Sequence, residues 1–500
     1  MEVLPQDVHN QTLVANAHPA DWTNPTLSGR YNLVAIGGGT AGIIAALGTA
    51  GLGGRAALVE RHLLGGDCLN FGCVPSKALI RASRIAHDIS RADQFGVNVG
   101  DVQVDFGAVM ERLRRLRAHI SHHDSAERFR SLSVDVHLGD AKFTGPDTLE
   151  VAGQTLHFHR AVIATGARAF VPPIDGLAEV GYLTNETIFS LTELPRRLIV
   201  IGAGPIGSEL GQAMHRLGSE VHLVGTSPTL LAKEDPEAAA AVQSQMERDG
   251  VRFHLGSSVV RVERDPDGKC VVIERDGQQQ RLVADEILVA VGRAANVEGL
   301  GLEAAGVEYD RRGVEVNDRL QTSNRRIFAA GDICTVYKFT HAADAMARIC
   351  IQNALFFGRK KMSSLVIPRV TYTDPELAQV GMTAADAEAA GMAIDSFRAD
   401  FSEIDRAIVD SEERGFAIVH TRKGTGKIVG TTIVGSHAGE LIGEITVLMT
   451  AGKPLGTLAG TIHSYPTKAE VLKRIADRYS HTKLTPLVAG AFTKWLAWRR

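Results

Sequence analysis

Two cysteines, Cys68 and Cys73, are separated by four residues in the segment LLGGDCLNFGCVPSKAL. The diglycine before them and the apolar run after Ser76 indicate a loop that enters a helix, and a helix N-terminus stabilises a thiolate. Two cysteines at this spacing can close a small disulfide ring and so exchange electrons as a dithiol. The alternatives are two inert buried cysteines or a zinc site, although no second Cys/His pair has ligand spacing. We interpret the remaining, isolated cysteines as structural: Cys270, Cys334 and Cys350.

The residues before this pair have the pattern of a dinucleotide-binding fold. The apolar segment YNLVAI precedes GGGTAG, a G-x-G-x-x-G formed by Gly37, Gly39 and Gly42, and a second apolar strand ends in Glu60. Such glycines let backbone N–H groups approach a pyrophosphate at a helix N-terminus, and the acid can bind a ribose hydroxyl. Residues 31–54 carry no charge, but their eight glycines and strand–turn–helix order favour a buried nucleotide-binding unit over a membrane span.

The same pattern recurs in LIVIGAGPIGSEL, where the glycines are Gly202, Gly204 and Gly207. Glu60 lies 23 residues after Gly37, whereas the same step from Gly202 reaches Gly225, so the second site lacks the ribose-binding acid. Two sites indicate one bound and one exchanged cofactor, and a flavin and a nicotinamide are the natural pair because hydride passes between them. Without that acid, a 2′-phosphate is not repelled, which favours NADPH over NADH, although no arginine is present to bind the phosphate. The polar residues nearby are Thr226, Ser227 and Lys233.

Composition bounds the class of protein. A length of 500 residues suggests about three domains, and 44% apolar with 22% charged residues excludes a disordered chain. The net charge of −3 gives no indication of a nucleic-acid partner. Five cysteines exclude a disulfide-stapled secreted scaffold, and the first 25 residues have no signal-peptide pattern, so we expect a cytoplasmic protein. Residues 1–29 are expected to form an irregular arm pinned by Trp22.

From about residue 30 to 480 the chain resembles the class I pyridine nucleotide-disulfide oxidoreductases, the FAD enzymes that include glutathione reductase, dihydrolipoyl dehydrogenase and mercuric reductase. The motifs are GGGTAG, GGDCLNFGCVPSK, ATG at 164–166, GAGPIGSE, AVGRAANV and AAGD at 329–332, and VTYTDPELAQVG at 370–381 resembles the start of the family's dimerisation domain. The resemblance implies an α/β fold with two Rossmann-like domains (three-layer β/β/α) and an α+β dimerisation domain. The implied bounds are 30–180 with 295–365 for FAD, 181–294 for NAD(P)H, 366–480 for dimerisation and 481–500 for an amphipathic helix.

The resemblance also implies catalytic roles. Cys73 would be the flavin-proximal thiol, and Cys68 the interchange thiol that meets the substrate. Lys77 would lie beside flavin N5 and pair with Glu209, since a cation near N5 favours the reduced, anionic flavin.

Further residues would bind the cofactor. Asp332 would hold the ribityl chain of the flavin, and His341 would open a helix aimed at the flavin ring. Thr165, Gly166 and Gly292 lie in the family motifs and complete the nucleotide-binding residues that the resemblance implies.

One motif departs from the disulfide reductases, whose H-P-T-x-x-E segment supplies from the partner subunit the acid–base His for a substrate thiol. Here Tyr465 stands at the His position, although the Pro and Thr are kept and Glu470 closes the motif. Because Tyr has a pKa near ~10 and His near ~6.5, only about one Tyr in a thousand is ionised at pH 7. Tyr465 can donate a hydrogen bond but is a poor general base. His463 shares its side of an extended segment, and we expect it to pack locally.

Mercuric reductases, as a family, also carry Tyr there, and reducing a thiolate-bound metal ion takes no proton from a dithiol. They end in a Cys-Cys pair, whereas this chain has no cysteine after Cys350 and no N-terminal G-M-T-C-x-x-C segment. Three functions stay open. The first is reduction of a disulfide or thiol-bound metal ion by a homodimer in which Tyr465 of one subunit covers Cys68 of the other. The others are dihydrolipoyl dehydrogenation and a redox-sensing flavoprotein docked on a membrane or partner.

Two histidine pairs, a basic segment and the C-terminal helix are expected at the surface. His157 and His159 alternate along a strand, and we interpret them as the solvated face of a meander rather than a metal site. The basic segment ERLRRLRAHI at 111–120 has no interleaved aromatics, so we expect a solvated helix face, with His122-His123 at the surface. Thr485-Pro486 starts a helix bearing two tryptophans, for which we favour docking on the body or a partner subunit over a membrane-surface anchor.

Overall fold

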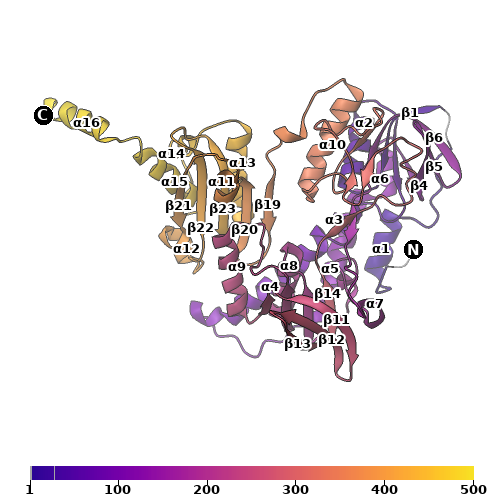
Figure 1. Ribbon diagram of the computed structural model, residues 1–500, viewed down its shortest axis with the longest axis horizontal. Helices are drawn as coiled ribbons and strands as arrows, with labels where there is room; N and C mark the ends of the chain where they lie inside the picture. Colours follow the sequence, from indigo (N-terminus) through magenta and orange to yellow (C-terminus); the bar gives the residue numbers. More distant parts are fainter. Residues whose placement is uncertain (1–2, 27–28) are drawn as a thin grey trace. The chain divides into compact units, whose positions relative to one another are not determined.

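The computed structural model describes residues 3–26 and 29–500, which form two compact units (Figure 1). The first unit contains the residues up to 226 together with 257–365, and the second contains 227–256 and 366–500. Within the described residues, no helix has the length and apolar character needed to cross a bilayer.

The first unit is built around a sheet that begins with β1 (Arg30–Ile36). β1 pairs in parallel with β2 (Ala56–Glu60) and with the second half of β6 (Gln154–Ile163). The first half of β6 pairs instead with an antiparallel strand, so one long strand joins a parallel sheet to a meander. The remaining strands of this sheet are β3 (Val134–Leu138), β4 (Ala141–Gly145), β5 (Thr148–Val151) and β18 (Ile327–Ala329).

Alternate residues of β1 enter two different cores. Leu33 and Ala35 belong to the core shared with the helices, whereas Val34 and Ile36 belong to the core shared with the meander. Both faces of the strand are therefore buried, which explains its continuous apolar run. The helices on one face are α2 (Thr40–Gly51) and α10 (Thr340–Leu355). With the meander on the other face, they form the expected three layers.

A second dinucleotide fold lies in the same unit. β8 (Arg197–Ile201) pairs in parallel with β9 (Glu220–Gly225) and β14 (Glu286–Val289), and α8 (Pro205–Arg216) follows the second glycine motif. The expectation of two Rossmann-like folds is confirmed. An antiparallel sheet shares the core of this fold and consists of β11 (Ser258–Asp265), β12 (Gly268–Arg275) and β13 (Gln278–Ala284).

The second unit is an α+β domain. Its antiparallel sheet runs in the order β19-β20-β23-β22-β21, and α13 (Ala438–Thr450) and α15 (Glu470–His481) share its core. This architecture confirms the expected class of the third domain. The strands are β19 (Pro368–Thr371), β20 (Glu376–Gly381), β21 (Ile394–Asp400), β22 (Phe416–Arg422) and β23 (Ile428–Gly435), and α9 (Pro236–Asp249) also contacts β20 and β23.

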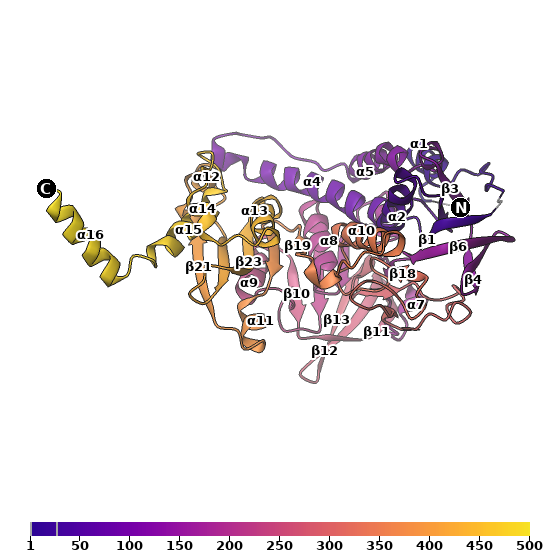
Figure 2. The same ribbon diagram turned by 90° about the horizontal axis from the view of Figure 1, so that it is seen from above.

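The N-terminal segment is not irregular, contrary to our expectation. It contains α1 (Val8–Ala17), which begins where Asp7 accepts a hydrogen bond from Asn10 N at 2.8 Å. Trp22 pins the segment as expected, since its Nε1 donates to Val136 O at 3.1 Å. Figure 2 shows α1 beside α5 (Phe106–Ser121), the basic helix. The sequence pattern did not predict this helix because α1 is only weakly amphipathic. Its packing against α5 stabilises it instead.

The expectation that α5 presents a fully solvated face is wrong for two arginines. Arg114 is 6% exposed and Arg117 is 2% exposed. Arg114 Nε donates to Asp7 Oδ2 at 2.5 Å, and Arg117 donates to Asn10 Oδ1 at 2.6 Å and to Asn70 O at 2.8 Å. Two of the three groups that accept these hydrogen bonds, Asp7 and Asn10, belong to α1 or its N-cap. The sequence pattern did not predict that helix. Because Asn70 closes the helix that carries Cys68, Arg117 links α1 to the cysteine segment.

Replacing Arg117 by alanine is expected to lower the free energy of unfolding by about 2–4 kcal/mol, because buried acceptors lose their donor and a cavity forms. Burial, then the like charge of Arg114, lowers the pKa of Arg117 to about 10, so it is protonated at pH 7. Urea denaturation measures the change. Arg115→Ala on the exposed side of α5 is the matched control, expected within about 0.5 kcal/mol. An equal loss of unfolding free energy in the two variants would contradict the role of Arg117 in linking α1 to the cysteine segment.

The histidines of β6 and of the segment after α5 lie at the surface. His157 and His159 are exposed on β6, and His122 and His123 are exposed after α5, as predicted. Among the described residues, no group of three or more metal-ligating side chains is assembled. Helix α16 (Pro486–Trp498) forms where expected, but none of its residues is buried, so it is not packed into the core of the second unit.

Candidate active site

The cysteine pair lies on two consecutive helices of the first unit. Cys68 is within α3 (Gly66–Asn70), Cys73 is the first residue of α4 (Cys73–Ser90), and both are free thiols. The diglycine that precedes them is required by a close approach: Gly66 has φ +57°, and a Cβ there would come within 2.6 Å of Gly39 Cα. The cysteine segment is thereby pressed against the first glycine motif.

The two thiols differ strongly in acidity. A hydrogen bond from Cys68 is the main cause that lowers the pKa of Cys73 to about 6, helped by Thr340 and by the charge of Lys77. Thr340 Oγ1 lies 3.4 Å from Cys73 Sγ, and the position at the start of α4 favours the anion as well. The same pairing raises the pKa of Cys68 well above its usual range. At neutral pH the pair is therefore a Cys73 thiolate next to a Cys68 thiol.

Alkylation of the reduced enzyme is expected to rise with pH through about 6, because Cys73 becomes a thiolate there and the thiolate is the nucleophile. Iodoacetamide trapping with mass spectrometry of Cys73 measures the profile. Cys68→Ala removes the main hydrogen-bond donor, so the midpoint should move up toward the ordinary thiol value of about 8.5. A midpoint that stays at its original pH in Cys68→Ala would contradict the assigned cause.

Lys77 and Glu209 form the contact that the resemblance implied. Lys77 Nζ donates to Glu209 Oε2 at 2.8 Å, across 132 residues of sequence. Lys77 lies one turn after Cys73 on α4, and Glu209 lies on α8 after the second glycine motif. The pair therefore joins the cysteine helix to the second dinucleotide fold, and the Glu209 side chain is 8% exposed.

The first glycine motif fits a dinucleotide. A Cβ at Gly37 would clash with the Ala164 carbonyl and one at Gly42 with the Gly37 carbonyl, whereas at Gly39 the nearest atom would be 3.7 Å away. The first turn of α2 has no side-chain cap among the described residues, so its N–H groups can face a pyrophosphate. Burial raises the pKa of Glu60. The backbone N–H groups of His62 and Gly38 donate to its two oxygens at 2.6 and 2.5 Å and act in the opposite direction, lowering that pKa.

Arg293 is a residue that the sequence analysis missed. Its side chain is 12% exposed, with Nη1 3.1 Å from Asp67 Oδ2 and Nε 3.3 Å from Asp332 Oδ2. It thus connects the residue before Cys68 to the acid expected to hold the ribityl chain. Its place in AVGRAANV, directly after Gly292, was the signal available. Burial raises the pKa of Asp332.

The other expected flavin-binding residues lie at helix and strand ends of the first unit. Thr165 Oγ1 donates to Asn296 O at 2.9 Å, and Gly166 O accepts from Asn296 N at 3.0 Å. His341 lies in the first turn of α10 and stacks on Phe339, with ring centroids 5.4 Å apart. Thr340, also missed, begins the same helix and contacts Cys73, so α10 meets the thiolate through its first residue.

The second glycine motif has the same construction. A Cβ at Gly202 would clash with the Ala290 carbonyl, one at Gly207 would clash with the Gly202 carbonyl, and one at Gly204 would meet open space. α8 begins at Pro205 without a side-chain cap among the described residues, as a pyrophosphate site requires. Of the other residues expected here, Thr226 and Gly292 are exposed in the first unit. In the second, Ser227 Oγ accepts from Thr229 N at 3.3 Å.

The motif with the departing tyrosine lies in the second unit. Tyr465 is 71% exposed, and its hydroxyl donates to Asp405 Oδ2 at 2.7 Å. This hydrogen bond raises the pKa of Tyr465 above its usual value, so even less tyrosinate is present to act as a base at neutral pH. His463 is held locally, with Nε2 3.0 Å from Glu444 Oε1 and Nδ1 3.2 Å from Thr461 O. Asp405, another missed residue, offers no motif in the sequence.

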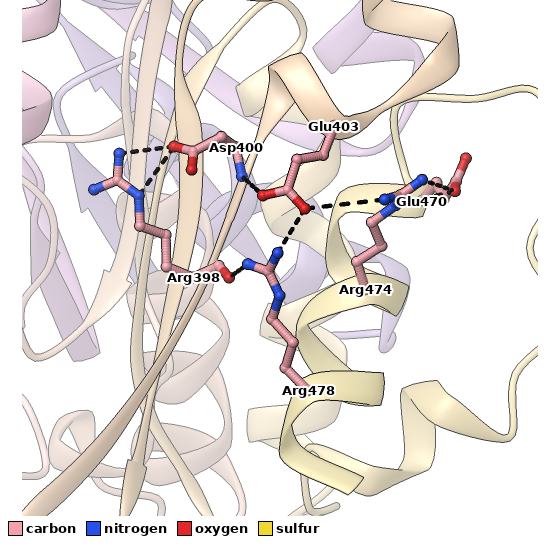
Figure 3. Close-up of polar contacts among 6 residues, drawn as sticks. All are labelled: Arg398, Asp400, Glu403, Glu470, Arg474 and Arg478. Carbon is pink, nitrogen blue, oxygen red and sulfur yellow. Dashed lines mark hydrogen bonds and ion pairs between the residues drawn. The ribbon is translucent and has the colours of Figure 1, made fainter. Parts of the chain in front are cut away.

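Glu470 is tied into a ladder of charges rather than to the tyrosine (Figure 3). Its Oε1 accepts from Arg474 at 3.1 Å, and Arg474 and Arg478 approach Glu403 at 3.9 and 2.5 Å. The other oxygen, Oε2, is buried, and no described residue donates to it. An unused buried acceptor thus stands in the position that the motif gives to the glutamate. The ladder continues from Glu403 through Asp400 to Arg398.

Comparison with known proteins agrees with the geometry. Residues 31–347 match the family model described as pyridine nucleotide-disulphide oxidoreductase, and residues 367–476 match its dimerisation domain. A mercuric reductase of Lysinibacillus sphaericus is 35% identical over 448 residues, covering 89% of this chain and 82% of the relative. A dihydrolipoyl dehydrogenase of Thermus scotoductus is 36% identical over 456 residues, covering 89% and 97%. The HOCl-induced flavoprotein disulfide reductase RclA of Escherichia coli superposes with TM-score 0.79 and 27% identity, covering 89% and 99%.

Proposed function

Because the chain belongs to the class I pyridine nucleotide-disulfide oxidoreductases, an FAD- and NAD(P)H-dependent family, we propose that it reduces a thiol-bound soft metal ion at Cys68 and Cys73. The first glycine motif would hold FAD, which would supply the electron carrier between NAD(P)H and the cysteines. The dimerisation domain supports a homodimer. The overall change is NAD(P)H + H⁺ + M(SR)₂ → NAD(P)⁺ + M⁰ + 2 RSH, where M is the metal ion that is reduced.

Tyr465 carries the proposal. A dithiol or disulfide substrate needs a general base or acid near neutral pH, and Tyr465, bound to Asp405, has its pKa raised rather than lowered. His463 does not replace it, because both of its ring nitrogens are engaged by Thr461 and Glu444. A metal ion already bound by thiolates exchanges ligands without that base, and thiolates are the ligands that soft metals prefer.

The cysteines are suited to this exchange. Cys73 is a thiolate at neutral pH, and Cys68 becomes one as it passes its proton to a leaving thiolate, so both can ligate the metal ion. The Lys77 cation lies one turn from Cys73 and stabilises negative charge on that sulfur. To donate a hydrogen bond to a departing thiolate, the Tyr465 hydroxyl of the partner subunit would first have to release Asp405, because it has only one proton. The cysteines, Lys77 and the tyrosine thereby have separate tasks in binding, charge stabilisation and release.

A second candidate is dihydrolipoyl dehydrogenation. The relative from Thermus scotoductus favours it, since the chain covers 97% of that enzyme at 36% identity. Glu470, kept from the H-P-T-x-x-E motif, favours it as well. The tyrosine opposes it, because this reaction removes protons from a dithiol.

The test is NADPH oxidation by the purified flavoprotein with Hg(II) in excess thiol, beside parallel assays with small disulfides and with dihydrolipoamide and NAD. We expect Hg(II)-dependent turnover well above the flavin–oxygen background, with dihydrolipoamide turnover low. Turnover with dihydrolipoamide alone would transfer the assignment to the second candidate. Turnover with small disulfides alone would also overturn the metal proposal.

A further inference from the structure

Helix α16 has an unusual distribution of side chains. At about 100° per residue, its large apolar side chains fall on one half of the circumference, and the other half carries only small residues, Thr493 and Lys494. The large side chains are strongly exposed, from 38% for Val488 to 87% for Leu487. They are Leu487, Val488, Phe492, Trp495, Leu496 and Trp498.

An apolar face of this size on a capped helix calls for a partner. Thr485 caps the helix by accepting from Val488 N, and Pro486 occupies the first turn, so the segment has its own start signal. α16 belongs to the second unit, and in Figures 1 and 2 it lies apart from the sheet of that unit. Among the described residues, none of α16 is buried.

The charge of the segment that contains α16 indicates the kind of partner that this helix binds. The sequence contains no Asp or Glu after Asp477, while Lys483, Lys494, Arg499 and Arg500 all follow it. A second copy of the helix would bring these cations against the same cations without an acid to pair with them. An anionic lipid surface compensates them, and each cation near such a surface strengthens binding about five-fold.

The aromatic residues point to the same partner. Trp495 and Trp498 lie side by side, with ring centroids 5.3 Å apart, and the Arg499 guanidinium lies 5.8 Å from the Trp495 ring. Tryptophans next to arginines are typical of the interface between lipid headgroups and acyl chains. A helix of 13 residues is about 20 Å long, shorter than the ~30 Å hydrocarbon core, so it fits along the surface.

We propose that α16 binds the surface of an anionic lipid bilayer through this apolar half, with the cations at the headgroups. The sequence favoured docking on the body or on a partner subunit over a membrane-surface anchor; the exposure of α16 speaks against the first of these, and the charge of the segment leads us to prefer the membrane surface to the second. The binding is independent of the substrate of the cysteine pair and places the flavoprotein at a membrane surface.

Vesicle flotation of the full chain tests the proposal, with phosphatidylcholine vesicles that contain or lack phosphatidylglycerol. We expect binding to the anionic vesicles that weakens as salt is raised. Trp495→Glu should weaken it at least about ten-fold more than Thr493→Glu, the matched control that adds the same charge on the opposite half. Bound FAD and NAD(P)H oxidation, unchanged in both variants, establish that they are folded.

Four outcomes would overturn the proposal. The first is no flotation with anionic vesicles, and the second is equal binding to neutral ones. The third is an equal loss in the Trp495 and Thr493 variants. The fourth is that Trp495→Glu splits a larger oligomer in light scattering without any vesicle binding, which would identify a second copy as the partner.

Discussion

Replacing Cys68 by serine is expected to lower acceptor-dependent NAD(P)H oxidation by at least about a thousand-fold, while FAD stays bound and is still reduced by NAD(P)H. We assign the exchange with the substrate to Cys68 because the family resemblance gives it the interchange role, while Cys73 carries the thiolate. Serine keeps the size and a hydroxyl donor for Cys73 but lacks the thiolate that binds a soft metal ion, and it cannot form a disulfide. The readouts are acceptor-dependent NADPH oxidation and the flavin absorbance.

Cys270→Ala is the control for Cys68→Ser. Cys270 is buried on β12, in the sheet beside the second dinucleotide fold, and none of the proposed steps uses it. We expect its turnover to match the unchanged enzyme. Undiminished acceptor turnover in Cys68→Ser would remove the interchange role from this residue and with it the proposed mechanism.

Replacing Tyr465 by histidine is expected to raise dihydrolipoamide-dependent NAD reduction by about a hundred-fold or more, the usual contribution of a positioned general base. The neutral imidazole can accept a proton from a dithiol at pH 8, whereas the Tyr465 hydroxyl donates to Asp405 and has a raised pKa. No described residue donates to the buried Glu470 Oε2, and we expect this oxygen to accept a hydrogen bond from the new ring. The rate should fall below about pH 6.5 as the imidazole becomes protonated.

Tyr465→Phe separates the two properties of the tyrosine. It removes the hydroxyl without adding a base, so dihydrolipoamide turnover should stay as low as in the unchanged enzyme. Turnover with Hg(II) in excess thiol should fall modestly, because only one hydrogen bond is lost. If Tyr465→His is no faster with dihydrolipoamide than Tyr465→Phe, the missing base is not what limits that reaction.

The sequence determined the local chemistry and the fold class. Gly37 and Gly202 each end a buried strand and begin a turn that only glycine fits, because a Cβ would clash with a neighbouring carbonyl. Such requirements are met within a few residues, so the pattern predicts them. The same holds for Cys73, whose place at a helix N-terminus follows from the residues beside it, and for the start of α16 at Thr485-Pro486.

Tertiary structure alone decided which distant residues meet. Arg117 is buried because α1, which the sequence pattern did not indicate, lays Asn10 against it. Arg293 joins Asp67 to Asp332, and Asp405 meets Tyr465 across 60 residues. These contacts set burial and pKa through neighbours that are close only after folding, and no spacing rule encodes them. Local geometry can therefore be derived from the sequence, whereas the electrostatic environment of each group depends on the packed chain.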